Sequence, residues 1–359
     1  MAGTIKAQLQ LGDSATATQN FTLTSAAADG TMKIARGNVG ATTQDILTVD
    51  INNKVSVNGL TASGDVQSAS QNGGPLAGFR NRLINGEFRI DQRNNYANVV
   101  IGNGASAFVA DRWLVNNQTD QSITATVVTT SNVTGISDTE SRLRVVATTV
   151  APTSGVVYIS QKIERVDTLA TSPTAFSAYM AGGVAEAVQM FLSQNFGSGG
   201  STAVQGAVNG FNVTGSFVKY TALVTLASTV GKTVGARNNL EAVFAIYLRT
   251  TNAFSIAYAQ LEPGSVATPF EFRPYAVELA LCQRYYETFA ATFSTTTRPY
   301  VDTFPYKVDK RSAPTLALIA GTANSATITG GVTATQSARA LTAATVASDL
   351  VYSANAELL

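Results

Sequence analysis

The stretch QLEPGSVATPFEFRPYAVELALCQRYYE, residues 260–287, separates two kinds of sequence. Before it, strand-length runs follow one another at short intervals. Within it, Pro269 and Pro274 fix the direction of the chain, and helical spacing begins just after them. We expect one short helix of about two turns, whose shared face holds Val277, Leu281, Arg284 and Tyr285. The stretch therefore predicts a joint between two modules rather than an active-site loop.

Upstream of this joint, residues 79–275 consist of strand-length runs separated by Gly, Asn, Ser and Thr. The clearest runs are QSITATVVTT (121–130), SRLRVVATTV (141–150), SGVVYISQKI (154–163), TAFSAYMAG (174–182), SFVKYTALVTL (216–226) and EAVFAIYLRT (241–250). AEAVQMFLSQN (185–195) has a helix-like composition, but it lacks a 3.6-residue period and glycines bracket it, so we predict a strand. Short strands at this spacing, without alternating helices, predict a jelly-roll β-sandwich.

Residues 1–62 form a thinner module, with Phe21 as the single aromatic residue. Within it, ILTVDINNKVSVNGL (46–60) alternates apolar and polar residues on both sides of Asn52-Asn53, which predicts a hairpin. The few bulky side chains of this module bury too little apolar surface to offset the loss of chain entropy on folding. We therefore expect that copies of the module or a host structure complete it. A tail without fixed structure is the alternative. Residues 63–78, rich in Gly, Ser and Gln, predict a linker.

Residues 276–359 begin with the predicted helix and continue with aromatic side chains crowded between Tyr285 and Tyr306. Three further strand-like runs follow, APTLALIAG, NSATITGGVTA and DLVYSANAELL. The sequence as a whole therefore predicts a mainly β protein. It has a thin N-terminal β attachment module, a central jelly-roll β-sandwich and a small C-terminal β head domain.

The composition excludes several functional classes. Lys and Arg number 24 against 23 Asp and Glu, so no net field attracts nucleic acid. The chain has no histidine, and Cys282 is its single cysteine, which removes the common acid–base and nucleophile pairs and any cysteine-based zinc site. The sequence also lacks a secretion-signal pattern and any run approaching the roughly 20 apolar residues of a membrane span. We expect no catalytic site, metal, cofactor or membrane insertion, and no enzyme.

Three patterns suggest chemistry but have simpler interpretations. VGKTVG (230–235) resembles a phosphate loop, but Leu226 stands where that loop needs its first glycine, so a turn is expected. A glycosidase site needs two carboxyl groups at a defined distance from each other, and the sequence does not give that distance. Its candidates are Asp91, Asp111, Glu262 and Glu271. The simpler expectation is that Asp111 pairs with Arg112 and that Glu262 closes a strand. An exposed aromatic such as Tyr96 is a candidate for stacking on a sugar ring, although no ligand-binding residue can be assigned.

The two ends of the sandwich segment carry a resemblance. NRLINGEFRIDQR (81–93), FVADRWLV (108–115) and AYAQLEPGSVATPFEFRPYAVELALCQRYYE (257–287) resemble the signature of a family of tailed-bacteriophage virion proteins, whose jelly roll is similar to carbohydrate-binding modules. The match departs at Phe272, Arg273 and Pro274. The resemblance implies structural signature residues at Asn85, Gly86, Asp111, Arg112, Trp113, Gln260, Leu261, Glu262, Gly264, Pro269 and Glu271. It also implies an inter-domain joint built on Leu281, Tyr285 and Tyr286.

The flanking segments extend this resemblance. PYKVDKRSAPTLAL (305–318) and YSANAEL (352–358) are similar to recurring strands of the family's head domain. GTMKIARGNVGATTQDILTVDINNKVSVNG (30–59) is similar to the attachment end of phage fibres, which are generally homotrimers. The resemblance implies a virion fibre assembled in the host cytoplasm, bound to other virion proteins through residues 1–62, whose sandwich meets host-surface carbohydrate. A capsid head fibre, decoration protein or tail adaptor without a receptor role is the alternative, and a polysaccharide depolymerase is a third.

Overall fold

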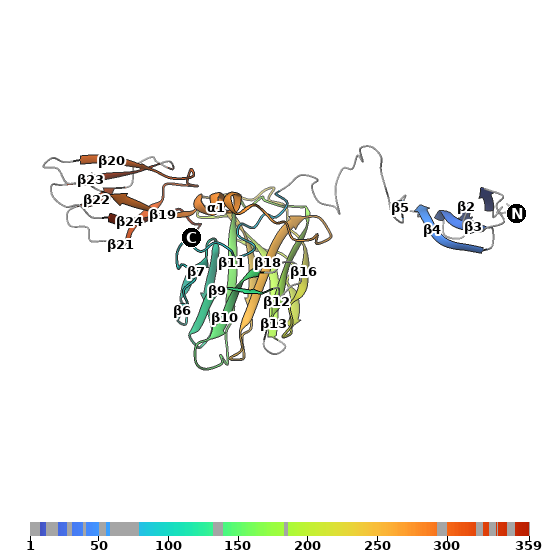
Figure 1. Cartoon of the computed structure of the whole chain (residues 1–359), viewed down its shortest axis with the longest axis horizontal. Helices are drawn as coiled ribbons and strands as arrows, with labels where there is room; N and C mark the ends of the chain where they lie inside the picture. Colours follow the sequence, from blue (N-terminus) through green and yellow to red (C-terminus); the bar gives the residue numbers. More distant parts are fainter. Residues whose placement is uncertain are drawn as a thin grey trace. The chain divides into compact units, whose positions relative to one another are not determined.

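The computed structural model divides the chain into two compact units, Met1–Ser68 and Ala69–Leu359. The residues that it describes contain strands and one short helix, so the predicted mainly β fold class is confirmed (Figure 1). The described ranges are 8–11, 21–26, 31–38, 41–49, 55–57, 79–131, 139–182, 186–292, 300–320, 326–329, 335, 337–342 and 349–358. The predicted linker 63–78 lies outside them.

The first unit holds one five-stranded antiparallel sheet in the order β1-β2-β3-β4-β5. Its strands are β1 (Gln8–Leu11), β2 (Phe21–Ala26), β3 (Thr31–Asn38), β4 (Ala41–Val49) and β5 (Val55–Val57). Leu47 pairs with Val57 in the last two strands, which confirms the predicted hairpin, while its turn at Asn52-Asn53 lies outside the described residues. Among the side chains described in this unit, the buried ones are small, Thr22 and Ala35.

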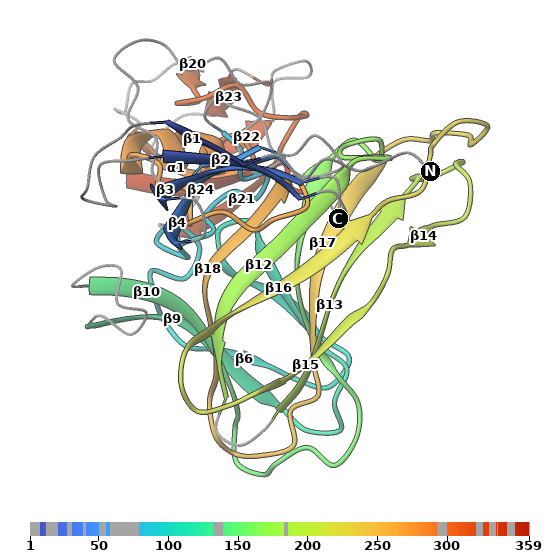
Figure 2. The same cartoon turned by 90° about the vertical axis from the view of Figure 1, so that its right-hand side faces the viewer.

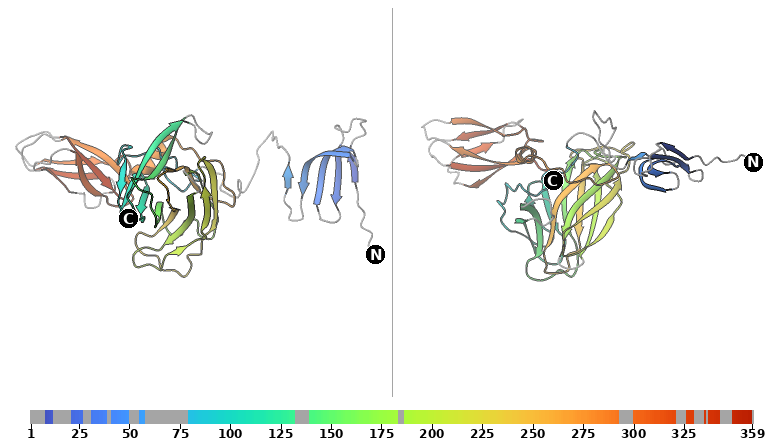
Figure 3. Two further views of the ribbon diagram at one scale, coloured as in Figure 1. Left: turned by 90° about the horizontal axis from the view of Figure 1, so that it is seen from below. Right: turned by 45° about the vertical axis from the view of Figure 1, so that its right-hand side comes forward.

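The second unit contains a sandwich of two sheets that face each other (Figures 2 and 3). Its strands are β6 (Val99–Ile101), β7 (Ser106–Ala110), β8 (Trp113–Asn117), β9 (Ile123–Ser131), β10 (Thr139–Ala147), β11 (Val157–Glu164), β12 (Pro173–Ala181), β13 (Glu186–Asn195), β14 (Val204–Gln205), β15 (Asn209–Val213), β16 (Val218–Thr225), β17 (Asn239–Ile246) and β18 (Phe254–Pro263). One sheet has the order β16-β12-β18-β10-β9-β6, and the other has β14-β13-β17-β11-β8-β7, with β15 beside β13. The six predicted runs and the 185–195 segment are all strands, as predicted.

The core lies between these sheets and is built on aromatic rings. Trp113, Phe176 and Phe244 are fully buried, with ring centroids 4.7 Å apart for the two phenylalanines and 6.3 Å apart for Trp113 and Phe244. Phe88 packs against Trp113 at 4.8 Å. Alternation along each strand decides which side chains enter this core: in β10, Leu143 is buried in it and its neighbours point to the other face of the sheet.

After β18 the chain forms the predicted helix and a small head. Helix α1 (Tyr275–Gln283) starts directly after Pro274, whose ring fixes φ and supplies no N–H that the helix would have to satisfy. Arg284 caps the helix, so Tyr285 lies beyond it and the predicted shared face extended too far. The head has two three-stranded sheets, β19-β24-β21 and β20-β23-β22. Their strands are β19 (Tyr286–Thr292), β20 (Tyr300–Pro305), β21 (Thr315–Ala320), β22 (Ala326–Thr329), β23 (Ser337–Thr342) and β24 (Asp349–Asn355).

Candidate functional site

The Asn-Gly signature holds the start of the second unit against the core. Asn85 adopts a left-handed backbone with φ of 56°, and its side-chain amide donates to the carbonyl oxygens of Ile90, at 2.8 Å, and Asp111, at 3.0 Å. The indole N–H of Trp113 donates to the Asn85 carbonyl at 2.8 Å. Asn85 is fully buried, so these bonds satisfy polar groups that would otherwise destabilise the core.

Gly86 is required by a close backbone approach. A Cβ at this position would lie 2.2 Å from the carbonyl oxygen of Ala259 in β18. The Ala259 amide in turn donates to the Gly86 carbonyl at 2.9 Å. Only glycine lets the incoming chain lie this close to the strand, which explains why the signature pairs asparagine with glycine.

The Gln-Leu-Glu signature fastens the outgoing chain to the outer face of the six-stranded sheet. The Glu262 carboxylate accepts three hydrogen bonds. They come from the backbone N–H of Thr268 at 2.8 Å, from the Thr268 hydroxyl at 2.6 Å and from the side-chain amide of Gln260 at 2.8 Å. Gln260 also accepts from the Glu271 amide at 2.8 Å. Glu262 is the penultimate residue of β18, so the prediction that it closes a strand is confirmed. Leu261 is buried in the core, Gly264 has φ of 130° at the turn, and the Pro269 carbonyl accepts from Gln260.

Glu271 connects the two ends of the sandwich segment. Its carboxylate oxygens accept from the backbone amides of Arg80 and Asn81, each at 3.0 Å, and Asn81 lies 190 residues away in the sequence. Burial raises the pKa of Glu271, but these hydrogen bonds and the charge of Arg273 outweigh it and leave the pKa lowered. The Asn81 side chain then accepts from the Leu261 amide at 2.9 Å. The structure thus brings the first and last signature motifs into one network.

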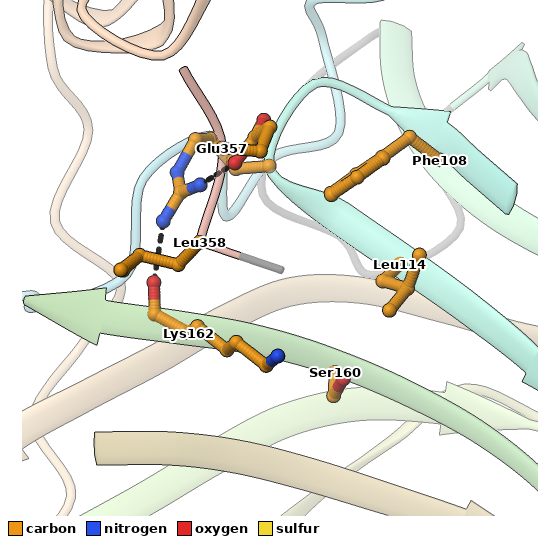
Figure 4. A pocket seen from close by; sticks show the side chains of 7 residues that line it. Phe108, Leu114, Ser160, Lys162, Glu357 and Leu358 are labelled. Atoms are coloured by element: carbon orange, nitrogen blue, oxygen red, sulfur yellow. Dashed lines mark hydrogen bonds and ion pairs between the residues drawn. The ribbon is translucent and has the colours of Figure 1, made fainter. Parts of the chain in front are cut away.

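The expected pair between Asp111 and Arg112 is wrong. Asp111 accepts hydrogen bonds from the backbone and the side chain of Gln92, and burial raises its pKa to about 7. Arg112 has φ of 73° and pairs with Glu357 instead, while also donating to the Lys162 carbonyl (Figure 4). Asp111 and Arg112 form the turn between β7 and β8, and the left-handed backbone at Arg112 directs its side chain to Glu357, so adjacency in the sequence did not imply a pair.

Arg112 belongs to a buried group that we call the arginine–tyrosine cluster, made of Arg93, Arg112, Tyr285, Tyr286 and Glu357. The Arg112 guanidinium carbon lies 3.5 Å from the centre of the Tyr285 ring, and that of Arg93 lies 3.7 Å from the centre of the Tyr286 ring. Glu357 accepts from both arginines, at 3.1 Å for Arg93. Burial raises the pKa of Tyr285 to about 12, so its hydroxyl stays protonated and donates to Glu164 at 2.7 Å.

The small hollow beside this cluster is too small for a ligand. Its volume is about 10 Å³, which is about the space for one water molecule. It is lined by Phe108, Arg112, Leu114, Ser160, Lys162, Glu357 and Leu358 (Figure 4). The side chains of Glu357 and Leu358 thus lie against sandwich strands here, and this region joins the head to the sandwich.

Leu281 makes none of the contacts of the arginine–tyrosine cluster described above. It is half-buried and lines an open, apolar hollow of about 420 Å³ along α1. The other lining residues are Ala276, Val277, Ala280, Arg284 and Val308. The structure therefore brings the two tyrosines into the arginine–tyrosine cluster and leaves Leu281 at the surface.

The four candidate carboxylates all make hydrogen bonds within the fold. The bonds of Asp111, Glu262 and Glu271 are described above, and Asp91 accepts from the backbone amides of Asn94 and Tyr96. Tyr96 is 44% exposed and donates its hydroxyl to the Arg89 carbonyl at 2.8 Å. Within the part of the chain that the structure describes, no group of acidic or cysteine side chains is arranged to hold a metal ion, and no helix is long and apolar enough to cross a bilayer.

A third hollow, which we call the arginine pocket, lies on the outer face of the six-stranded sheet. It has a volume of about 390 Å³ and is lined by Arg142, Arg144, Ala181, Gly182, Gly215, Phe217, Asn252, Ala253 and Ser255. Sequence reasoning missed it. The alternation of SRLRVV does place both arginines opposite Leu143, but nothing in the sequence showed that this face would stay open.

The likenesses to solved structures described below are distant. No protein-family model and no curated protein matches the chain. Among solved structures, TmCBM61 in complex with β-1,4-galactotriose is 12% identical with a TM-score of 0.32, covering 51% of this chain and 99% of its own. The enzymatically active domain of bacteriophage CBA120 tailspike protein 4 is 14% identical with a TM-score of 0.34, covering 53% of this chain and 22% of its own. A cyclase from Fischerella sp. TAU is 12% identical with a TM-score of 0.33, covering 51% of this chain and 96% of its own. Likenesses this distant, to a sugar-binding module and to enzymes, carry no argument about function.

Proposed function

We propose that the protein is a structural fibre of a tailed-phage virion, a homotrimer attached through residues 1–62 that displays its sandwich towards host-surface glycans. The observation that carries this proposal is the network of signature residues. The motifs that resemble the phage family form partly buried hydrogen bonds at the two ends of the sandwich segment, where Glu271 accepts from the backbone amides of Arg80 and Asn81. The resemblance therefore rests on residues with a shared structural task.

The first unit supports the trimeric part of the proposal. It is one five-stranded sheet, and the buried side chains described in it, Thr22 and Ala35, are small. A single sheet needs a second layer to exclude water from one of its faces. Two further copies of the chain supply such layers in a trimeric fibre.

The arginine–tyrosine cluster supports display of the sandwich and head as one body. Arg112 of the sandwich and Glu357 of the C-terminal segment are both nearly inaccessible to solvent. Buried charge pairs of this kind are costly to separate, so the two modules stay together under load. Three sandwiches on one fibre would also bind a glycan surface with an avidity that a single weak site does not reach.

Two alternatives share the same fold. A capsid head fibre, decoration protein or tail adaptor needs the attachment unit but no receptor site, and immunogold labelling of particles separates a position on the shell from one at the tail. A polysaccharide depolymerase predicts release of oligosaccharides from host glycan. The hydrogen bonds that engage Asp91, Asp111, Glu262 and Glu271 in the fold weigh against that alternative.

The first test is the native mass of the full chain, measured by light scattering. We expect the mass of three chains, and a variant lacking residues 1–68 should be smaller than a trimer. Binding of the fluorescently labelled trimer to host cells, and its loss after enzymatic removal of surface glycans, then tests the receptor role. A chain that stays monomeric at high concentration contradicts the fibre and favours a single-copy decoration or adaptor protein.

A further inference from the structure

We infer that the arginine pocket binds a carboxylate-bearing sugar, such as a uronic acid, with the carboxylate between Arg142 and Arg144 and the sugar ring beside Phe217. The inference rests on the proposed glycan-binding function and names the class of sugar and the site. It concerns residues outside the signature network and outside the arginine–tyrosine cluster.

The backbone places both guanidinium groups on one face. Arg142 and Arg144 lie two positions apart in β10, so both point away from the core, and their Cα atoms are roughly 7 Å apart. Arg144 stands directly opposite Ser255 of β18, which is itself paired with Ala181 of β12. The floor of the pocket is therefore a rigid part of the sheet, which is a suitable support for a binding site.

The charge of the pocket is not neutralised by the described residues that line it, since none of them is acidic. Arg142 has a buried Nε without a hydrogen-bond partner among the described residues, as do Arg93, Arg112 and Arg273. Burial, and then the charge of Arg144, lowers the pKa of Arg142. A carboxylate bound between the two guanidinium groups would relieve the repulsion and accept hydrogen bonds from their terminal N–H groups.

Two other arginines of this unit bind a carboxylate through two N–H groups at once. Arg284 binds both oxygens of Glu164, at 3.0 and 3.1 Å, and Arg165 binds both oxygens of Asp167, at 3.0 and 2.6 Å. These forks are the geometry that a sugar carboxylate would complete at Arg142 or Arg144. No such carboxylate pairs with Arg142 or Arg144 among the described residues.

The remaining walls suit a sugar ring. Phe217 is half-buried, and its ring centre lies 5.6 Å from the guanidinium carbon of Arg142, so an apolar surface stands next to the charge. Gly215 and Gly182 leave the rim without side chains. Asn252 and Ser255 add hydrogen-bonding groups. A volume of about 390 Å³ lies in the range of pockets that hold small ligands, and a few polar groups beside an aromatic ring are usual for them.

Isothermal titration of the full-length protein tests the inference. The probes are oligosaccharides containing galacturonate, glucuronate or N-acetylneuraminate, and each is paired with its methyl ester, which keeps the shape and removes the charge. We expect at least one acid to bind tenfold or more tightly than its ester, and added salt to weaken this binding. Arg142→Gln and Arg144→Gln should each weaken it at least tenfold, and Phe217→Ala should weaken it less.

Lys232→Gln is the matched control, because it removes one positive charge from an exposed loop away from the pocket and should leave binding unchanged. The fluorescence of Trp113, the single tryptophan, shows whether each variant is folded. For a variant that does not fold, Arg144→Lys replaces it, since lysine keeps the charge and loses the fork.

Each other result has a separate meaning. Equal binding of acids and esters, or unchanged binding by both arginine variants, overturns the pocket and leaves glycan attachment intact. Tighter binding of phosphate- or sulfate-bearing oligosaccharides than of carboxylated ones overturns the sugar class. No binding to any probe by a protein that still adheres to host cells also overturns the pocket, whereas loss of cell binding as well counts against the proposed function itself.

Discussion

Two pairs of arginines in the second unit differ in burial and in whether a carboxylate pairs with them. In the arginine–tyrosine cluster, Arg93 and Arg112 are largely buried and share the carboxylate of Glu357. In the arginine pocket, Arg142 and Arg144 are half-buried at an open surface, and no carboxylate of the described residues pairs with them. The first pair is committed to holding the chain together, and the second is available to something outside it.

The contrast follows from the free energy of desolvation. A guanidinium that loses its water must gain a carboxylate and further acceptors, or the fold is destabilised by several kcal/mol. Arg112 gains Glu357, the Lys162 carbonyl and the face of Tyr285. A guanidinium that keeps part of its water can remain unpaired at little cost, and the pocket therefore adds little to stability while retaining binding capacity.

The largest effect is expected from Glu357→Gln. This change keeps the shape of the side chain but leaves Arg112 charged and buried without its counter-charge. We expect the free energy of unfolding to fall by about 3–5 kcal/mol, as for other buried pairs broken on one side. Urea unfolding followed by Trp113 fluorescence measures it.

Glu241→Gln controls for the loss of a carboxylate. Glu241 lies in β17, half-buried and without an ion pair among the described residues, so this substitution should change the free energy of unfolding by less than about 0.5 kcal/mol. Equal effects of the two substitutions would show that the arginine–tyrosine cluster does not hold the modules together.

The next effect compares the same substitution at a glycine packed inside the fold and at a glycine on the rim of the arginine pocket. Gly86→Ala forces a Cβ to within 2.2 Å of the Ala259 carbonyl oxygen, and we expect a loss of about 3 kcal/mol. Gly215→Ala on the rim of the arginine pocket meets only the Gly182 carbonyl oxygen at 3.5 Å, an ordinary contact, and should change stability by less than about 1 kcal/mol. Thermal unfolding of both variants measures the two losses of stability. A Gly86→Ala variant as stable as the wild type would contradict the close backbone approach.

The strands and the joint could be predicted because their signals are local. Alternation marked β9 and β10, and glycines around 185–195 marked β13 against its helix-like composition. Pro274 marked the start of α1. Each of these signals depends on the backbone preferences of a few neighbouring residues, and tertiary contacts did not override them.

The partners of charged residues could not be predicted, because they depend on which distant segments meet. Arg112 pairs with Glu357, which lies 245 residues away, and not with the adjacent Asp111. Whether the face that carries Arg142 stays open to solvent likewise depends on distant segments, since Phe217 and Asn252 line the same pocket. Sequence alternation assigns a side chain to one face of a sheet, but it does not show what covers that face.

The pH dependence of the free energy of unfolding should distinguish the buried carboxyl of Asp111 from exposed carboxyl groups. Burial raises the pKa of Asp111 from 3.8 to about 7, so the folded state keeps a proton that the unfolded chain releases. Stability from this group is therefore present below about pH 4 and is lost as the pH rises towards 7, by about 1.4 kcal/mol per pH unit for one proton. In Asp111→Asn this contribution is absent, so the stability of the variant relative to the wild type should rise between pH 5 and pH 7.

Urea unfolding at pH 5, 6 and 7 checks the slope. Asp120→Asn is the control, since hydrogen bonds from Thr153 lower the pKa of that exposed carboxyl and it stays ionised throughout this window. Parallel slopes for the wild type and Asp111→Asn would mean that Asp111 is ionised in the folded protein.

The smallest effect is the one that separates the two arginine pairs most directly. Arg144→Gln should change the free energy of unfolding by less than about 0.5 kcal/mol, because the side chain keeps part of its water and has no carboxylate to lose among the described residues. The same variant is expected to weaken binding of an acidic sugar at least tenfold, so stability and binding should move independently at this site. A fall in stability as large as that of Glu357→Gln would show that Arg144 is engaged inside the fold, and the pocket would then have no free guanidinium to offer.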